Sequence, residues 1–308
     1  MSYVLGIDGG GSKTVCVLMN DKREILGRGK AGSSNYQSVG IEAAKYSIES
    51  AINTALIQYK NINIDAICLG LAGVGRSKDI EVVKNIVKDI PIIRNIEPQN
   101  IIISHDALIA LVGGIGNDVG IVVAAGTGSI VFGRNYQGET KRVGGCGYIL
   151  GDEGGAYKIA VAGMQAALKA HDGRLVYTSL IEDFKSYFDL NNIEELIEVI
   201  YRSGLGVKEI AALAPIVDNA AFLGDEVANN IIDDAVNELV KATVTVINEI
   251  FVEGEFVEVV TTGSVWKSKS KMWERFVSCI NPQIKVIFPR FEAVYGAGLL
   301  ALKCWINT

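Results

Sequence analysis

Residues 4–18, VLGIDGGGSKTVCVL, place an aspartate, three glycines, a serine and a lysine directly after a short apolar run. Glycines and a small hydroxyl at the end of a strand allow backbone N–H groups to approach a phosphate closely. A P-loop is excluded, because it needs glycine immediately before Lys13 and again five residues earlier, where Ser12 and Ile7 stand. The residues after Thr14 continue as a strand, so the helix that a P-loop or a dinucleotide fingerprint requires is missing. A glycine-rich hairpin that binds nothing and needs only a positive φ is the alternative.

The same chemistry returns in the second half of the chain as AAGTGS, residues 124–129. An apolar strand again enters a glycine turn and continues directly into a second strand, about 115 residues after the first copy. Two such turns facing each other across a cleft would present N–H groups and hydroxyls to a polyphosphate from both sides. Asp8, at the end of the first strand, is suited to a hydrated Mg²⁺, with an Asx-turn cap as the alternative.

These turns must be positioned by strands and helices, which the hydrophobic periodicity predicts along the whole chain. The alternation of strands with helices predicts an α/β fold, and the repeated strand–turn–strand unit predicts an internal duplication. The glycine clusters at 9–11, 113–116, 126–128, 144–147 and 151–155 mark loops, and a domain boundary is expected at 113–118. An antiparallel meander is predicted at 3–8, 14–19 and 24–28. Further strands are predicted at 64–73, 100–107, 140–144, 256–262 and 284–288, and helices at 41–59, 78–89, 156–170, 179–188, 192–202, 207–222, 226–251 and 292–305.

The composition is that of a packed globular protein of one or two domains. The 308 residues are 49% apolar and 21% charged, and the net charge is −6. An acidic chain without a run of Lys and Arg is a poor binder of nucleic acid. Five cysteines without C-x-x-C spacing argue against a disulfide framework or a zinc site. The sequence has no leader pattern and no long apolar stretch, so we expect a cytoplasmic protein without a membrane span.

Seven segments, in order over nearly the whole chain, resemble motifs of the N-acetylglucosamine kinase-like (BadF/BadG/BcrA/BcrD ATPase) family of the actin/hexokinase/Hsp70 superfamily. The resemblance implies two ribonuclease-H-like (actin-like ATPase) domains with an interdomain cleft. The first would be residues 1–115, with a C-terminal helix at about 292–308 packing back on it, and the second would be 116–291. The matching segments are GIDGGGSKT (6–14), SSNYQSVG (33–40), SHDALIAL (104–111), AAGTGSIVFGRN (124–135), GGCGYILGDEGGAYKIA (144–160), TTGSVWKS (261–268) and EAVYGAGLLAL (292–302).

The resemblance implies an ATP-dependent kinase that converts an amino sugar, N-acetylglucosamine first, to its 6-phosphate, with Mg²⁺ at Asp8. Asp106 would accept the proton of the attacking hydroxyl, and a helix N-cap for 107–112 is the alternative. Asn35 would bind the sugar, with an ordinary Asn turn as the alternative. The full set implied to contact the sugar is Asn35, Asp106, Thr127, Gly145, Cys146, Gly147 and Asp152.

By the same resemblance, ATP would lie on both glycine turns and on a separate adenosine site. Gly263 and Ser264 would lie against the adenosine. Ala214, among the small residues 211–215, would form the other wall, and an ordinary Ala-rich helix face is the alternative. The residues implied at the phosphates are Gly10, Gly11, Ser12, Lys13, Gly126, Thr127 and Gly128.

Other functions are compatible with the same motifs. Glucosamine and N-acetylmuramic acid are alternative substrates, because Ala72 stands near a position where some N-acetylglucosamine kinases have a serine. An ATPase activator of an iron–sulfur dehydratase would need paired cysteines, and only Cys146 is suitably placed. A non-catalytic sugar sensor or scaffold is the third alternative. A homodimer is implied by the family alone.

Overall fold

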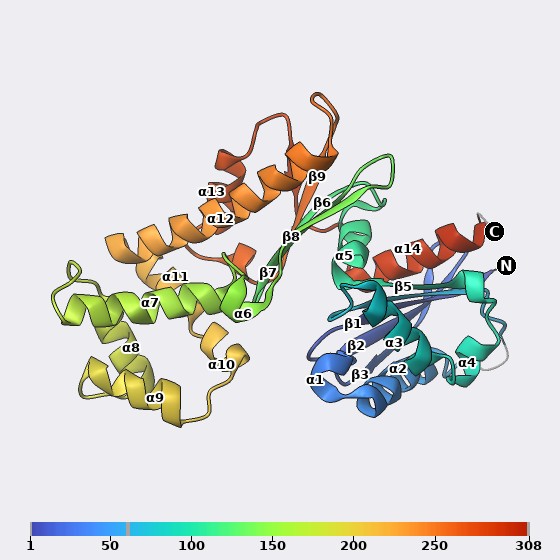
Figure 1. The fold of residues 1–308 in the computed structure, drawn as a ribbon, viewed down its shortest axis with the longest axis horizontal. Helices are drawn as coiled ribbons and strands as arrows, with labels where there is room; N and C mark the ends of the chain where they lie inside the picture. Colours follow the sequence, from blue (N-terminus) through green and yellow to red (C-terminus); the bar gives the residue numbers. More distant parts are fainter. Residues whose placement is uncertain (1, 60–61, 307–308) are drawn as a thin grey trace. The chain divides into compact units, whose positions relative to one another are not determined.

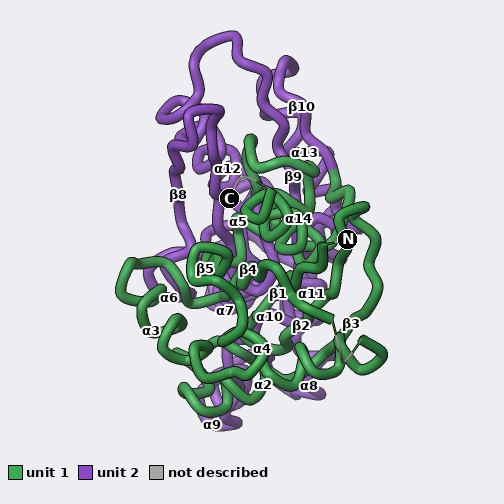
Figure 2. Tube along the Cα trace, turned by 90° about the vertical axis from the view of Figure 1, so that its right-hand side faces the viewer, with its two compact units in different colours: residues 1–122, 288–308 green, residues 123–287 purple. Residues whose placement is uncertain are grey.

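The computed structural model describes residues 2–59 and 62–306, which divide into two compact units (Figure 2). Unit 1 comprises the chain up to Val122 together with the residues from Phe288 onward, and unit 2 comprises Val123–Ile287. Two five-stranded sheets are present, each with helices packed against it (Figure 1). The predicted α/β class is therefore confirmed.

The sheet of unit 1 has the strand order β3-β2-β1-β4-β5. The first three strands form the predicted antiparallel meander, and β4 and β5 run parallel to β1. Gly9 pairs with Leu71, and Leu71 pairs with His105, so β1, β4 and β5 end level at one edge. Asp8 and Asp106 therefore emerge at the same edge, the one where open α/β sheets bind ligands. The strands are β1 (Tyr3–Gly9), β2 (Thr14–Asn20), β3 (Ile25–Ala31), β4 (Ala66–Leu71) and β5 (Ile101–His105).

Helices cover both faces of this sheet, because successive side chains of a strand point to opposite sides. Leu5 belongs to the core formed with α2 and α3, whereas its neighbour Val4 belongs to the core formed with α5 and α14. The helix predicted at 41–59 ends at Ala55. The helices of unit 1 are α1 (Tyr36–Val39), α2 (Ile41–Ala55), α3 (Ser77–Val87), α4 (Pro91–Arg94), α5 (Asp106–Ile115) and α14 (Ala293–Ile306).

The close packing of α14 corrects one prediction. Gly113 and Gly114 lie inside α5, not in a loop. A Cβ at Gly113 would lie 2.4 Å from the carbonyl oxygen of Glu292, and one at Gly296 would lie 2.1 Å from that of Ile109. These glycines are therefore explained by the near contact of two helices, which only the folded chain reveals.

The sheet of unit 2 repeats the arrangement with the order β10-β9-β6-β7-β8. Again the three strands around the glycine turn lie together, and two later strands extend the sheet on the side of the first. This equivalence confirms the internal duplication predicted from the two glycine turns. The strands are β6 (Gly120–Ala125), β7 (Ser129–Arg134), β8 (Thr140–Gly144), β9 (Glu258–Thr262) and β10 (Lys285–Ile287).

The helices Gly147–Leu150 and Met272–Cys279 of unit 2 are missing from the prediction, and two predicted helices differ in form. The helix expected at 207–222 is broken into α10 and α11, because Pro215 lacks an N–H and its ring would clash with the carbonyl of Ala211 in a continuous helix. The helix expected at 192–202 begins as a 3₁₀ turn, Ile193–Glu195. Among the described residues, no helix is long and apolar enough to cross a bilayer. The helices are α6 (Gly147–Leu150), α7 (Ala156–His171), α8 (Leu180–Phe188), α9 (Leu196–Arg202), α10 (Val207–Ala211), α11 (Ala214–Phe222), α12 (Glu226–Ile250) and α13 (Met272–Cys279).

Candidate functional site

The first glycine turn (residues 9–13) joins β1 to β2 in unit 1. The Gly10 N–H donates to the carbonyl of Lys13 at 2.9 Å, and Gly11, Ser12 and Lys13 are exposed. Neither Gly10 nor Gly11 has a positive φ, and a Cβ at Gly11 would meet nothing within 4 Å. The positive φ that would explain glycines in a ligand-free hairpin is therefore absent at both positions. The fold itself gives no reason for glycine at Gly11.

The second glycine turn (residues 126–128) joins β6 to β7 in unit 2. It also contains a glycine for which the fold gives no reason. The Gly126 N–H donates to the Gly128 carbonyl at 2.9 Å, and Thr127 is exposed. Gly126 also lacks a positive φ, and a Cβ there would meet nothing within 4 Å. Its carbonyl accepts the N–H of Ala156 at 2.8 Å, which fixes the turn to the first residue of α7. A rigidly held turn with open space above its glycine can admit a ligand close to its backbone.

The two carboxylates at the edge of the unit 1 sheet influence each other. Burial, together with the negative charge of Asp106, raises the pKa of Asp8 to about 6, and Lys13 opposes the shift. Among the described residues none donates a hydrogen bond to the Asp8 side chain, so the Asx-turn alternative is wrong. Asp106 is the first residue of α5, and the helix is capped by His105, whose Nδ1 accepts the Leu108 N–H at 3.2 Å. The N-cap alternative for Asp106 is therefore also wrong.

A divalent cation fits this pair of carboxylates. A cation at Asp8 would relieve the repulsion and the burial that raise its pKa, and hard cations prefer carboxylate oxygen. No cluster of three or more His, Cys, Asp and Glu side chains suited to a metal occurs in the described parts of the chain. The donor set thus suits Mg²⁺, which keeps most of its waters and is bound by one or two carboxylates plus phosphate oxygens.

Asn35 lies in the segment that we call the Asn35 loop (residues 33–40), beside the first glycine turn. Its Oδ1 accepts the Gln37 N–H at 3.1 Å and so caps α1. Since Oδ1 is the acceptor in this bond, the side-chain Nδ2 is the group left for a ligand, and it has no partner in the described part of the chain. Gly73, with a φ of +83°, leaves room for this side chain, because a Cβ there would lie 2.6 Å from Oδ1. The Asn turn and a ligand contact are compatible.

Asp152 lies in the GDEG loop (residues 144–154) of unit 2 and has a φ of +63°. Burial raises the pKa of its carboxyl group, although it accepts backbone N–H bonds from Gly147 and Ser129. A Cβ at Gly128 would lie 2.3 Å from an oxygen of this carboxylate. Asp152 therefore joins the GDEG loop to the second glycine turn, a role that the sequence does not indicate.

The other predicted residues of the GDEG loop form an open backbone arch. Gly145 and Gly147 have φ values of +66° and +82°, which favour glycine. The Gly145 carbonyl accepts a hydrogen bond from Arg142. Cys146 is exposed, and its Sγ lies 3.7 Å from the Gly144 carbonyl oxygen. The arch presents main-chain groups and one thiol to solvent.

A hollow of about 390 Å³ in unit 2 brings the two predicted adenosine segments together. Ala211, Ala214 and Pro215 line one part of it, and Ser264 lines another. Gly263 has a φ of +111°, and a Cβ there would lie 2.1 Å from the Ala125 carbonyl oxygen. The volume, and the small residues on the side of Ala211 and Ala214, are compatible with a planar base.

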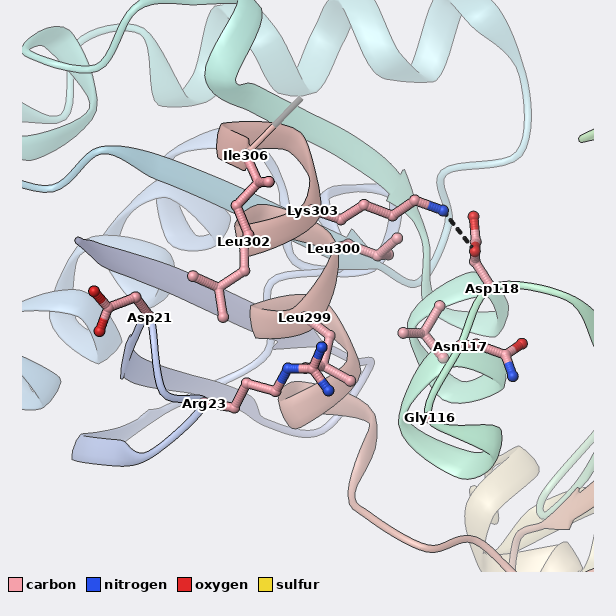
Figure 3. A pocket seen from close by; sticks show the side chains of 11 residues that line it. Asp21, Arg23, Gly116, Asn117, Asp118, Leu299, Leu300, Leu302, Lys303 and Ile306 are labelled. Atoms are coloured by element: carbon pink, nitrogen blue, oxygen red, sulfur yellow. Dashed lines mark hydrogen bonds and ion pairs between the residues drawn. The ribbon is translucent and has the colours of Figure 1, made fainter. Parts of the chain in front are cut away.

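A second hollow, of about 320 Å³, contains none of the predicted residues (Figure 3). It lies in unit 1 between the β2–β3 turn, the end of α5 and one side of α14. Asp118 and Lys303 form an ion pair at 2.7 Å on one side of it, and Asp21 and Arg23 line the other.

Two residues that position the Asn35 loop were not predicted. Tyr36 donates its hydroxyl to Asp79 at 2.8 Å, and Gln37 donates its Nε2 to the Gly73 carbonyl at 2.7 Å. Both contacts cross about 40 residues of sequence. No local pattern could have indicated them.

Comparisons with known proteins agree with this geometry. The sequence pattern of the BadF/BadG/BcrA/BcrD ATPase family matches residues 5–301. An N-acetylmuramic acid/N-acetylglucosamine kinase of Clostridium acetobutylicum is 35% identical and covers 98% of both chains. An N-acetyl-D-glucosamine kinase of Dictyostelium discoideum is 33% identical, with 97% of each chain covered.

Solved structures share the fold. A candidate N-acetylglucosamine kinase from Chromobacterium violaceum superposes with a TM-score of 0.73 at 23% identity, covering 98% of this chain and 99% of that one. A ROK family glucokinase from Streptomyces griseus, in complex with glucose and AMPPNP, has a TM-score of 0.56 at 16% identity and covers 98% and 100%. These likenesses confirm the prediction of two actin-like α/β domains.

Proposed function

Since the chain belongs to the BadF/BadG/BcrA/BcrD ATPase family, we propose that it is an ATP-dependent kinase that phosphorylates an amino sugar, N-acetylglucosamine first. The observation that carries this proposal is the pair Gly11 and Gly126, whose lack of a side chain has no cause in the fold. Each stands in the turn of an equivalent hairpin, one in each unit. A phosphate that approaches the backbone of each turn explains why both positions are glycine.

In the proposed reaction Asp106 is the general base, and Asp8 would bind the cation. The oxygen of the sugar 6-hydroxyl attacks the γ-phosphorus, and Asp106 accepts the proton of this hydroxyl. The bond between the γ-phosphorus and the β–γ bridging oxygen breaks, and ADP leaves. Asp8 would hold Mg²⁺, which would supply positive charge to the phosphate oxygens.

The remaining predicted residues bind and orient the two substrates. Ser12 and Lys13 contact the phosphates from unit 1, and Thr127 with Gly128 from unit 2. Asn35 donates Nδ2–H to a sugar oxygen, while Asp152 accepts from a sugar hydroxyl and holds the arch Gly145–Gly147 in place. Ser264 and Ala214 enclose the adenine in the hollow of unit 2.

The names of the two relatives support an N-acetylated amino sugar, and one of them includes N-acetylmuramic acid. Ala72 cannot donate a side-chain hydrogen bond to the sugar, as a serine at this position could. N-acetylmuramic acid and glucosamine are therefore the next substrates to compare. We further expect a cytoplasmic homodimer, which light scattering after gel filtration would test.

A screen of ADP release across amino sugars, hexoses and no sugar tests the function. We expect sugar-dependent release with N-acetylglucosamine, and a fall of at least about 100-fold in kcat for Asp106→Asn. The control is Asp89→Asn, the same change at an exposed ion pair with Arg94. ADP release that no sugar stimulates, or full activity of Asp106→Asn, would contradict the proposal.

A further inference from the structure

The Asn35 loop is held on its first side by the glycine turn of unit 1. The Ser33 hydroxyl donates to the Gly10 carbonyl at 3.1 Å, and the Ser34 N–H reaches the same oxygen at 3.3 Å. Ser34 is buried, and a Cβ at Gly9 would lie 2.2 Å from its Oγ. The start of the loop is thus attached to the turn that is proposed to bind phosphate.

The second side of the loop is held by Asp79, which lies in the first turn of α3. The Asp79 carboxylate is 4% exposed and accepts five hydrogen bonds. Two come from the backbone N–H groups of Gly75 and Arg76, at 3.1 and 2.9 Å, and these cap the helix. Two come from the Arg76 guanidinium, both at 3.1 Å, and the last comes from the Tyr36 hydroxyl at 2.8 Å.

The bond from Tyr36 is not needed to cap α3. A capping carboxylate requires only the backbone donors, so the Tyr36 hydroxyl adds a link between α1 and α3. The Arg76 fork orients both oxygens of Asp79, which fixes the position that the hydroxyl reaches. Helix α1 has four residues and cannot be stable by itself, so its position depends on such links.

We propose that Tyr36 and Asp79 are positioning residues for the sugar, acting through Asn35. Asn35 is adjacent to Tyr36 and caps α1, so the link from Tyr36 to Asp79 determines where the Asn35 Nδ2 donor stands. This inference rests on the proposed kinase function. It predicts that the loop binds sugar poorly when the link is cut, although every sugar-contacting group is still present.

The test compares Tyr36→Phe with wild type and with Tyr46→Phe, the same change at a 74% exposed tyrosine on α2. For Tyr36→Phe we expect the KM for the amino sugar to rise about tenfold, because one hydrogen bond to a charged group is lost. The KM for ATP and kcat should change less than about twofold. Tyr46→Phe should match wild type in all three constants.

A double-mutant cycle with Asn35→Ala separates positioning from a general structural effect. If Tyr36 acts through Asn35, the Tyr36→Phe change has little further effect on the sugar KM once Asn35 is alanine. An equal tenfold rise in both backgrounds would overturn the inference. So would a parallel loss of sugar affinity, ATP affinity and melting temperature.

Amide hydrogen exchange tests the hydrogen bond from Tyr36 to Asp79 independently of catalysis. In Tyr36→Phe the amides of residues 36–40 should exchange at least about tenfold faster than in wild type, and in Tyr46→Phe they should not. Unchanged exchange together with an unchanged sugar KM overturns the inference while leaving the proposed function intact. Absence of sugar-dependent ADP release in wild type would instead count against the proposed function, and exchange would still decide on the link.

Discussion

Five glycines of this chain fall into two groups, separated by what a methyl group would meet. Gly113, Gly263 and Gly296 are required by the fold, because a Cβ would approach a backbone oxygen within 2.4 Å or less. Gly11 and Gly126 are not, since they have ordinary backbone angles and open space. Substitution of each group should therefore affect different properties.

For Gly11→Ala and Gly126→Ala we expect unchanged or slightly higher stability, by up to about 1 kcal/mol, because alanine restricts the unfolded chain. The KM for ATP should rise at least about tenfold, since a methyl group would stand where a phosphate approaches the backbone. Urea unfolding and steady-state kinetics measure the two effects. Gly263→Ala is the contrast, because this substitution should lower the free energy of unfolding. An unaltered ATP KM in both turn variants would remove the main support for a phosphate at these turns.

Asp8 predicts a pH dependence of the ligand-free protein. Its pKa of about 6 lies above the ordinary value of 3.8, so between these values the folded state binds more protons than the unfolded state. The free energy of unfolding must then fall as pH rises from about 4 to above 6, by at most about 3 kcal/mol. Asp8→Asn should not show this loss and should be more stable than wild type at pH 7, but similar near pH 4. Urea unfolding without nucleotide or Mg²⁺ measures both; parallel pH profiles for the two proteins would exclude this role of Asp8.

The sequence could indicate Asp8, Asn35 and Asp106, because each follows a strand or a recognisable motif. It could not indicate the further contacts of Asp152 or the link from Tyr36 to Asp79. The Tyr36 and Asp79 positions are 43 residues apart, and nothing in either neighbourhood signals the other. The residues proposed to bind ligands lie in local motifs, whereas the contacts of the proposed positioning residues form only in the packed fold.

Among the elements, the meanders and most helices follow from the sequence, because hydrophobic period and turn residues agree there. Pro215 indicates a helix break, but the Ala-rich pattern around it favours one continuous helix in the prediction. The position of Gly113 inside α5 could not be predicted from the sequence. Glycine is needed there because the start of α14, far along the chain, packs against it. Pairs of elements distant in sequence are where a reading by local pattern fails.

The contact of α5 with α14 makes a prediction about stability. Gly113→Ala should destabilise unit 1 by about 2–3 kcal/mol, because the added Cβ would press against the backbone at Glu292 and the helices would have to separate. Thermal unfolding measures the loss. Gly11→Ala supplies the matched control, the same substitution without a neighbour. Equal melting temperatures for both variants would mean that this helix contact yields at little cost.

At the scale of the whole molecule, the segment that returns to unit 1 at Phe288 is bonded to the end of α5. The Arg290 N–H donates to the Gly114 carbonyl and the Phe291 N–H to the Gly113 carbonyl, both at 3.0 Å. The Arg290 guanidinium also donates to the Ile115 carbonyl. The segment that returns from unit 2 is thus bonded to the helix end from which the outgoing segment departs.

The position of α14 in this topology sets the order in which the chain can fold during synthesis. Unit 2 is continuous in sequence, whereas the sheet of unit 1 has one face that only α5 and α14 cover. The core that contains Val4, Cys68 and Ile109 is therefore complete only when α14 has been synthesised, after all of unit 2. Domains usually complete in the order of synthesis, and this protein reverses that order. Its first-made half therefore has an apolar face that α5 alone covers until α14 has been synthesised.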